Sequence, residues 1–414
     1  MKAALLAAFF SVTAATALWS QVAPSESISD AAVEAAAQQA VTLMLSHQES
    51  YDFKAERAAE QKARTEKAAH AGIPGFTAGA EWPYQGVYRV ASGEIPPGYR
   101  VGGSAICCLG LLRAPGFAAD AARRASVLKA TEFILRELKD EPLMAEGFLG
   151  SYDVRGWGHS YALEWLLRGL DAKVFDDALA LRVRKVAQTL VTTLERTEIA
   201  DSGGWNYSRR GGKSASPAST FMTAPTLQAL FLAQERGLKV DKAVVTRALK
   251  TLEDARLQSG AFQYGTDPAR QTGKGFEDVA GACARMAVCE STLLLAGRGS
   301  VERVQSAVEA FFTHWEWLEK RRCQTGTHVP PYMIAPYYFH YAHTYTAQAI
   351  ELLPEAARPA LRQKLRALYW RTRDSDGGWN DRVFLRSESY GSAMAIWGLM
   401  APTLPPPPRW TSGA

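Results

Sequence analysis

The chain has 414 residues, of which 47% are hydrophobic, and its formal net charge at pH 7 is +5. This apolar content is enough for a large core, and so mild a charge gives no nucleic-acid-binding signature. Five cysteines are too few for a disulfide scaffold and have no zinc-ribbon spacing, although one pair could be oxidised in an exported chain. We expect Cys107 and Cys108, within the apolar "AICCLGLL", to be buried free thiols.

The N-terminus predicts export. Lys2 precedes "AALLAAFFSVTAATAL", an apolar run typical of a signal peptide and too short to span a bilayer comfortably. Small residues follow at Ala15 and Ala17, with Ser20 as another cleavage position. We therefore expect residues 1–20 to be a signal peptide and the protein to be periplasmic or secreted; a signal anchor is the alternative. No later run of about 20 apolar residues predicts a membrane span.

A glycine followed by an aromatic residue recurs in the polar loops of the chain. The instances are Gly86–Tyr88, Gly150–Tyr152, Gly203–Trp205, Gly260–Phe262 and Gly377–Trp379. The aromatic residues are separated by steps of 64, 53 and 57 residues and then by one of 117, which predicts a degenerate unit in the last gap. The sequence therefore predicts six repeat units.

Each unit pairs two kinds of helix. Segments that are apolar around most of their circumference predict buried helices; they span 102–114, 158–170, 218–236, 277–297, 338–353 and 386–400. Segments with an apolar stripe opposite a charged face predict outer helices; they span about 28–48, 119–138, 177–197, 241–256, 300–319 and 356–371. We found no alternating strand pattern of any length, so we expect an all-α chain.

Six such pairs predict a six-hairpin α/α toroid, with an inner ring of parallel helices inside an outer antiparallel ring. An open solenoid is the alternative. Closure is favoured because an open array needs polar capping repeats, whereas the last unit ends in the apolar "YGSAMAIWGLMAP". We expect the toroid to span 26–402, with its first helix against the last hairpin, and 403–414 to be a Pro-rich tail. The polar segment 52–70 is expected to extend the first outer helix or to stand away from the body.

The glycines of these loops allow a tight turn where an outer helix ends. We expect Trp205 and Trp379, which follow the two Gly-Gly pairs, to be structural residues that pack under the neighbouring hairpin.

Three stretches resemble the prenyltransferase and squalene-cyclase repeat superfamily, the terpenoid cyclase/protein prenyltransferase toroids. They are "DSGGWNYSRR…FMTAPTLQALFLAQERGLKV", "QSGAFQYG…GFEDVAGACARMAVCESTLLLAG" and "RDSDGGWND…SYGSAMAIWGL". The likeness covers most of the mature chain and is closest to exported bacterial members of unassigned activity. It implies a toroid with a central cavity for an isoprenoid-like or other lipidic substrate.

The chain departs from the superfamily at its reactive motifs. Ile199, Arg256 and Arg373 replace the Gln of the cyclase repeat, and the acidic D-x-D-D cluster does not occur. Asp278 and Cys283 are five residues apart, so they lie on different faces of a helix and do not reproduce the D-x-C zinc pair. Neither cyclase nor zinc-dependent transferase chemistry is implied.

Parallel inner helices place their N-termini, with their partial positive charge, on one rim of the ring. Cations in the loops that lead to this rim are Arg100, Arg155, Arg209, Arg210, Lys213, Arg270, Lys274 and Arg386. Acids there are Glu94, Asp153, Asp267, Asp381 and Glu388. One hypothesis is that the rim accepts an anionic or electron-rich group; the alternative is an ordinary solvated loop face.

Titratable and aromatic side chains at the first turns of the inner helices are the candidate site. The candidate acids and bases are Asp278, His159, His343 and Glu388, and the candidate substrate-binding residues are Trp157, Tyr161, Arg209, Tyr338, His340 and Tyr345. Asp278 would serve equally as a helix N-cap, and the histidines as hydrogen-bonded core residues. His340 and His343 have a spacing suited to metal but no third ligand, so we predict no metal site, and no cofactor is indicated.

Three functions remain open from the sequence. The first is an enzyme or binding protein for an isoprenoid-like or other lipidic ligand. The second is a polysaccharide-active lyase or hydrolase, because aromatic side chains also stack on sugars. The third is a non-catalytic binding or scaffold protein of the cell envelope, because fold does not fix function.

Overall fold

The computed structural model describes residues 27–51, 79–86, 95–139, 154–199, 202–207, 217–266 and 272–411. The predicted signal peptide, the polar segment 52–70 and the loop aromatics Tyr88 and Tyr152 lie outside these residues. The prediction of an all-α chain is confirmed, because helices dominate the described residues. None of these helices combines the length and apolar character that crossing a membrane requires.

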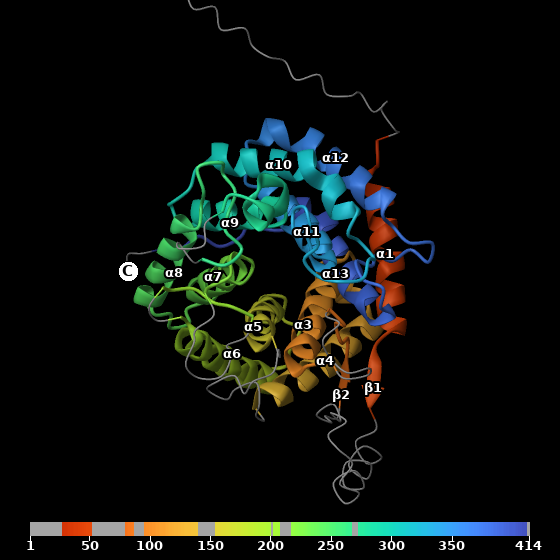
Figure 1. Cartoon of the computed structure of the whole chain (residues 1–414). Helices are drawn as coiled ribbons and strands as arrows, with labels where there is room; N and C mark the ends of the chain where they lie inside the picture. Colours follow the sequence, from red (N-terminus) through yellow and green to blue (C-terminus); the bar gives the residue numbers. More distant parts are fainter. Residues whose placement is uncertain are drawn as a thin grey trace, which may run out of the picture.

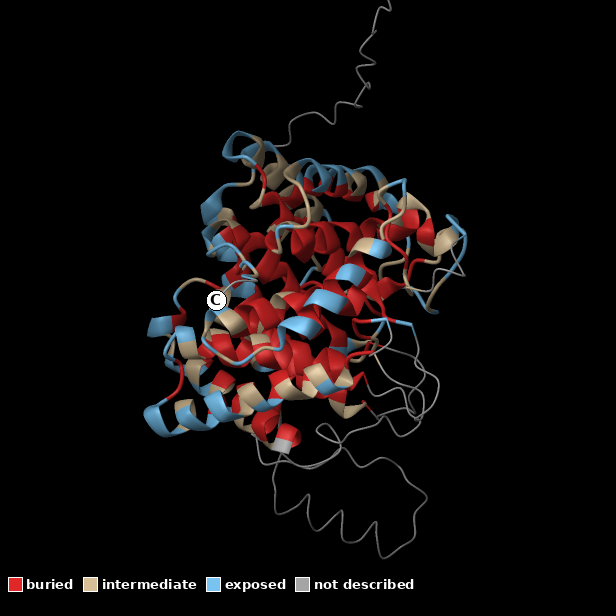
Figure 2. Cartoon of the chain, turned by 90° about the vertical axis from the view of Figure 1, so that its left-hand side faces the viewer, coloured by how far each residue is buried: buried red, intermediate tan, exposed pale blue. Residues whose placement is uncertain are grey.

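Six buried helices form the centre of the molecule. They are α3 (Pro97–Arg113), α5 (Arg155–Asp171), α7 (Thr220–Glu235), α9 (Val279–Leu295), α11 (Phe339–Ile350) and α13 (Glu388–Met400). Their ranges follow the predicted apolar segments, although α3 begins five residues and α5 three residues earlier than expected. Nearly all their residues are buried, and Figure 2 shows them as the red interior of the molecule.

Six amphipathic helices surround this centre. They are α1 (Asp30–Ser46), α4 (Ala121–Lys139), α6 (Asp177–Thr197), α8 (Lys242–Asp254), α10 (Val301–Glu319) and α12 (Arg358–Arg371). Their charged faces lie at the periphery, which is pale blue in Figure 2. Asp176, Asp241 and Ser300 cap the first turns of α6, α8 and α10 by accepting backbone N–H groups.

The six inner helices contact one another in a closed order. Along the chain each contacts the next, and α13 contacts α3, so the last inner helix meets the first (Figure 1). The first outer helix, α1, packs against α13, as expected from the sequence. Its N-terminus joins α12 through hydrogen bonds between Ile28 and Gln363 and an ion pair of Asp30 with Arg366. This closed order of contacts is the one that a six-hairpin ring requires.

Short elements complete the described chain. Strands β1 (Glu49–Tyr51) and β2 (Gly79–Glu81) form a small antiparallel pair, which the sequence did not predict. Single 3₁₀ turns span Phe117–Ala119, Gly275–Glu277, Pro336–Tyr338, Glu355–Ala357, Leu385–Ser387 and Ala401–Thr403. Four of these turns lead directly into or out of inner helices.

Buried tryptophans fasten outer helices to inner ones through a repeated pair of hydrogen bonds. The indole N–H of Trp205 donates to the carbonyl of Leu194 in α6 (2.8 Å), and its backbone N–H donates to Thr223 Oγ1 in α7 (3.1 Å). The Trp379 indole donates to the Tyr369 carbonyl in α12 (2.9 Å), and its backbone to Ser392 Oγ in α13 (3.1 Å).

Trp82 repeats this arrangement in the first unit. Its indole donates to the Met44 carbonyl in α1 (2.7 Å) and its backbone to Ser104 Oγ in α3 (3.0 Å). The repeat motif predicted Tyr88 as the aromatic residue of this unit, whereas Trp82 is the residue that makes these bonds.

The Pro-rich segment lies against the ring. From α13 it runs along the end where the inner helices terminate, and the Trp410 N–H donates to the Leu295 carbonyl at the end of α9 (3.0 Å). The Trp410 ring packs on Phe231 of α7, with centroids 5.6 Å apart, and Thr411 exchanges hydrogen bonds with Gln234. We call residues 404–411 the C-terminal strap.

Candidate functional site

An aromatic pocket lies at the N-terminal end of the inner helices. Eight aromatic side chains line it: Tyr84, Tyr99, Trp157, Tyr207, Phe221, Tyr337, Tyr341 and Tyr390. Its volume is about 40 Å³, room for a few heavy atoms rather than for a whole lipid. Because residues from the first turns of α3, α5, α7, α11 and α13 meet here, these helices share one direction around the ring.

A positional pattern produces this pocket. The aromatic side chain is the third residue of α3 (Tyr99), α5 (Trp157), α11 (Tyr341) and α13 (Tyr390), and Phe221 is the second residue of α7. The third residue of α9 is Gly281, where any side chain would collide with the backbone of Gly275 and Tyr332. Counting from the helix starts would have found this pattern, but the predicted starts of α3 and α5 were several residues late.

The rings of the pocket pack on one another at close range. Tyr84 stacks on Tyr390, with centroids 3.9 Å apart, and lies 5.8 Å from both Tyr99 and Trp157. On the other side, Phe221 lies 5.0 Å from Tyr341. The faces of aromatic rings carry partial negative charge, so this lining favours an apolar or cationic group over an anion.

Several hydroxyl groups of the lining are already used within the protein. The Tyr341 hydroxyl donates to the Phe221 carbonyl (3.0 Å), and the Tyr84 hydroxyl donates to Asp381 Oδ2 (3.4 Å). Tyr337 shares a hydrogen bond of 3.2 Å with His328. The pocket therefore presents ring faces more than hydrogen-bonding groups.

Asp381 is a buried carboxyl behind this lining, and sequence reasoning had noted it only as a rim acid. Its side chain is fully buried, and burial raises its pKa from the ordinary 3.8 to about 7, although Arg382 acts in the opposite direction. Its Oδ1 makes no hydrogen bond within the described part of the chain. Asp381 does not line the pocket itself but reaches it through Tyr84.

Two of the four described cations of the predicted rim form ion pairs. Arg100 forms a bidentate ion pair with Glu81, in which both side chains are buried, and Arg386 pairs with Glu49 at 2.6 Å. Arg155 is buried in the first turn of α5, whereas Lys274 is exposed. The remaining predicted rim residues, Arg209, Arg210, Lys213, Arg270, Glu94, Asp153 and Asp267, lie outside the described residues.

The interior beneath the pocket is filled by side chains. Tyr161 of α5 and Tyr345 of α11, which stand opposite each other in the order of inner helices, bring their hydroxyl oxygens to 3.0 Å. Burial raises the pKa of both phenols. The predicted binding residues Trp157, Tyr161 and Tyr345 thus belong to one aromatic column, in which Trp157 lies 5.3 Å from Tyr161.

Two further predicted binding residues lie near this column. Tyr338 stacks on Phe221 with centroids 4.4 Å apart, one layer outside the pocket lining. His340 is fully buried, and burial lowers the pKa of its imidazole well below the ordinary value. Arg209, the sixth predicted substrate-binding residue, lies outside the described residues.

The candidate histidines lie in the helix packing rather than in the pocket. The Trp315 indole N–H donates to His343 Nε2 (2.8 Å), so the other ring nitrogen, Nδ1, carries the proton and donates to the Phe339 carbonyl (2.7 Å). Burial lowers the pKa of His343 to about 3. His159 is likewise fully buried in α5. This environment favours the alternative that these are core histidines.

The two candidate carboxylates lie apart from the aromatic lining. Asp278 caps α9 by accepting the Ala280 backbone N–H (2.9 Å), as the helix-cap alternative requires. Glu388 begins α13, where its Oε2 is 3.6 Å from His47 Nδ1. Burial, followed by the proximity of Asp376, raises the pKa of Glu388 to about 7.

A larger cavity opens at the opposite, C-terminal end of the inner helices. Its volume is about 550 Å³, and it is lined by the last turns of α3, α5, α11 and α13, the residue that follows α7, and residues 403–407. Arg113, Glu164, Gln348 and Trp397 are among its wall residues. The sequence predicts no site at this end.

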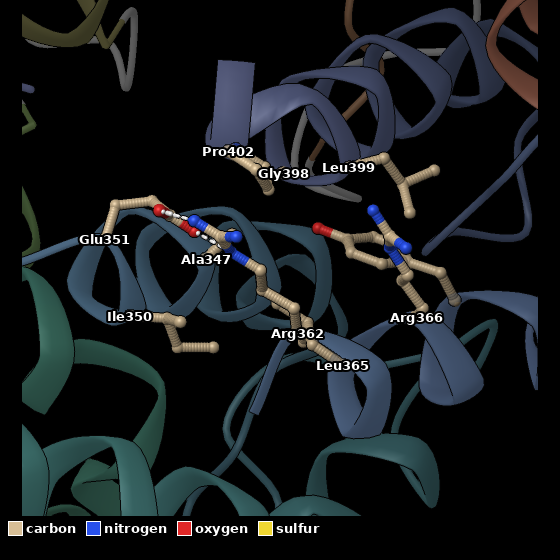
Figure 3. Close-up of a pocket in the computed structure, with 10 residues that line it drawn as sticks. Ala347, Ile350, Glu351, Arg362, Leu365, Arg366, Gly398, Leu399 and Pro402 are labelled. Carbon is tan, nitrogen blue, oxygen red and sulfur yellow. Dashed lines mark hydrogen bonds and ion pairs between the residues drawn. The ribbon is translucent and has the colours of Figure 1, made fainter. Parts of the chain in front are cut away.

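The remaining hollows are less suited to a substrate. A crevice of about 10 Å³ between α11, α12 and α13 holds about one water, and there Glu351 pairs with Arg362 (Figure 3). A hollow of about 500 Å³ lies on the outer side, along α8. Within the described residues, no three His, Cys, Asp or Glu side chains are grouped to hold a metal ion. All five cysteines are free thiols, and Cys107 and Cys108 are buried.

Comparisons with known proteins assign no family. No protein-family model matches the chain, and no curated protein sequence matches it. Among solved structures, it is similar to a structure described as the "Crystal structure of Salmonella alpha-2-macroglobulin reacted with methylamine", with 14% sequence identity and a TM-score of 0.37. The match covers 64% of this chain and 17% of that one. A likeness at this level supports no assignment of fold or activity.

Proposed function

We propose that this protein binds the apolar, unsaturated end of an isoprenoid-like or similar lipidic ligand in the aromatic pocket. The observation that carries the proposal is the convergence of eight aromatic side chains, from five inner helices and their adjoining loops, on one small cavity. Ring faces attract polarisable, electron-poor or cationic groups more than they attract anions. The resemblance of the repeat stretches to the terpenoid cyclase and prenyltransferase toroids points to the same class of ligand.

A lipidic ligand fits this lining better than a polysaccharide does. Sugars stack on aromatic faces, but they also require hydrogen-bonding groups for their hydroxyls. The Tyr84 and Tyr341 hydroxyls are already engaged with Asp381 and Phe221. A cavity of about 40 Å³ also admits the end of a chain more readily than a sugar ring within a polymer.

The proposal is for binding and assigns no reaction. Asp381 is the buried acid nearest to the lining, but the Tyr84 side chain separates it from the pocket. The candidate acid–base residues His343 and Asp278 already serve in helix packing and helix capping. We therefore infer a role for Asp381 in holding Tyr84 against Tyr390.

Calorimetric titration with a C15 or C20 isoprenoid alcohol tests the proposal. We expect saturable binding that is stronger than binding of the saturated alcohol of equal length, because the more polarisable unsaturated chain gains more from contact with ring faces. Trp157→Leu keeps an apolar side chain but removes a ring, and we expect it to weaken binding about 3- to 10-fold, for a contact worth ~1 kcal/mol. Trp370→Leu, on the partly exposed side of α12, is the matched control.

Two results would overturn the proposal. One is the absence of binding by the folded protein. The other is equal weakening by Trp157→Leu and Trp370→Leu, which would place the ligand elsewhere. Binding of oligosaccharides in preference to the isoprenoid alcohol would favour the polysaccharide alternative.

A further inference from the structure

The cavity at the C-terminal end of the inner helices has the features of a second, separate binding site. Its volume of about 550 Å³ lies within the range of small-molecule pockets. It lies beyond the Tyr161–Tyr345 pair from the aromatic pocket, because its wall comes from the last turns of the same helices whose first turns form that pocket. A ligand here is therefore independent of the proposed function.

Arg113, at the end of α3, is the central polar group of this cavity. Its side chain is only 8% exposed; Nη2 donates to Glu164 Oε1 (2.8 Å), and the guanidinium lies 3.6 Å from the centre of the Trp397 ring. Nη1 has no hydrogen-bond partner among the described residues. A buried N–H without a partner is destabilising, so a ligand atom that accepts from it gains binding affinity.

Gln348 supplies a complementary group. It lies on α11, which neighbours α13 and therefore Trp397. Its side-chain oxygen is buried and makes no hydrogen bond within the described chain. The strap beside it, Pro405–Pro407, has no backbone N–H groups and therefore cannot supply this donor.

The charges of the wall exclude a strongly ionic ligand. Three arginines and three carboxylates line the cavity, so their formal charges cancel. Glu164 neutralises Arg113, Asp171 pairs with Arg236 (2.6 Å), and Glu351 is held by Arg362, as Figure 3 shows. Arg168 also lines the cavity and lies 3.9 Å from Asp171. The buried polar atoms of this wall that make no hydrogen bond within the described chain are one donor, Arg113 Nη1, and one acceptor, Gln348 Oε1, beside the Trp397 ring.

We propose that this cavity binds a neutral, amide-bearing ligand such as a short peptide segment. The amide carbonyl accepts from Arg113 Nη1, the amide N–H donates to Gln348 Oε1, and the Trp397 side, together with the prolines of the C-terminal strap, contacts the apolar part. One amide group carries both of the missing partners in a fixed arrangement, which a carboxylate or an alkyl chain does not.

Saturation-transfer NMR with blocked tripeptides, acetylated at the N-terminus and amidated at the C-terminus, tests this site on the full chain. We expect saturable binding by the native protein. Arg113→Lys keeps the charge beside Glu164 but removes the guanidinium fork, and Gln348→Leu removes the acceptor; we expect each to weaken binding at least 5-fold. Arg182→Met, which affects only an exposed ion pair with Glu132, should leave it unchanged.

The contradicting outcomes are distinct. Absence of blocked-peptide binding to the native protein would overturn the proposal. So would variants Arg113→Lys and Gln348→Leu that bind the blocked peptide as tightly as the native protein does. Binding only of peptides with a free carboxylate would show an anion site instead. Isoprenoid binding should be the same in Arg113→Lys and in the native protein. A negative result with blocked peptides therefore does not affect the aromatic-pocket proposal, and a negative result with isoprenoid alcohols does not affect this one.

Discussion

The hydroxyl oxygens of Tyr161 and Tyr345 meet at 3.0 Å between opposite inner helices, and this contact separates two cavities of different character. On one side lies the aromatic pocket and on the other the cavity of Arg113 and Trp397. The pair therefore joins two opposite inner helices across the interior and leaves a separate cavity at each end.

We predict that Tyr161→Phe and Tyr345→Phe each lower the free energy of unfolding by about 1–2 kcal/mol, because each leaves one buried hydroxyl without its partner. The double variant should cost less than the sum of the two, since it leaves neither hydroxyl. Urea unfolding of all four proteins measures the coupling. Strict additivity would show that the two hydroxyls do not interact.

The tryptophans that join outer to inner helices should contribute more to the free energy of unfolding than the burial of their rings alone implies. Replacing Trp205 or Trp379 by Phe keeps a ring but removes the indole N–H that donates to Leu194 or Tyr369. We expect each change, and Trp82→Phe likewise, to cost about 2–4 kcal/mol from the lost hydrogen bond and the smaller ring. Thermal unfolding monitored by circular dichroism measures this loss of stability, and Trp370→Phe is the control. Equal effects at all four sites would refute this role.

The buried Glu81–Arg100 ion pair predicts an asymmetric mutational response. Arg100→Met removes the bidentate partner of the buried Glu81 carboxylate, which should cost about 3–5 kcal/mol. The double variant Glu81→Leu/Arg100→Met should recover most of that loss, because neither charge remains. Chemical denaturation of the native protein and the two variants measures these differences in the free energy of unfolding. A double variant as unstable as Arg100→Met would show that Arg100 acts through other contacts.

Asp381 predicts a specific dependence of stability on pH. Because burial raises the pKa of this carboxyl to about 7, the folded chain holds the proton more tightly than the unfolded chain does. Stability should therefore fall as the pH rises from about 4 to about 7, by a few kcal/mol at about 1.4 kcal/mol per pH unit, and change no further from this group above that range.

Asp381→Asn removes this titration and keeps an acceptor for the Tyr84 hydroxyl. The variant should lose less stability than the native protein between pH 4 and pH 7.5, measured by urea unfolding, whereas exposed Asp177→Asn should follow the native curve. Glu388 titrates in the same range in all three proteins and cancels in the comparison. Parallel curves for Asp381→Asn and the native protein would contradict the assignment.

The helices were predictable from the sequence, whereas the site was only partly so. Apolar and amphipathic periodicity depends on local sequence alone, and the twelve predicted ranges correspond to α1 and α3–α13. The pocket depends on where each inner helix begins, and the early starts of α3 and α5 concealed the shared aromatic position of Tyr99 and Trp157.

Long-range pairing explains what else the sequence left undecided. The partners of Arg100, Asp381 and Tyr161 are 19, 297 and 184 residues away, so nothing in their local sequence identifies them. Trp82 was missed for a related reason: it lies 38 positions after Met44, so the local sequence does not show that it packs at the end of α1. The strap was predicted as a tail because its contacts with α7 and α9 leave no periodic pattern.

Photolabelling tests the central claim most directly. A diazirine placed at the unsaturated end of a C15 isoprenoid alcohol, followed by mass spectrometry of the digested protein, reports which side chains touch that end. We predict adducts on the peptides that contain Tyr84, Trp157 and Tyr390, reduced by excess unlabelled alcohol. Adducts confined to the Trp397 cavity, or scattered over exposed residues without competition, would contradict the assignment of the ligand to the aromatic pocket.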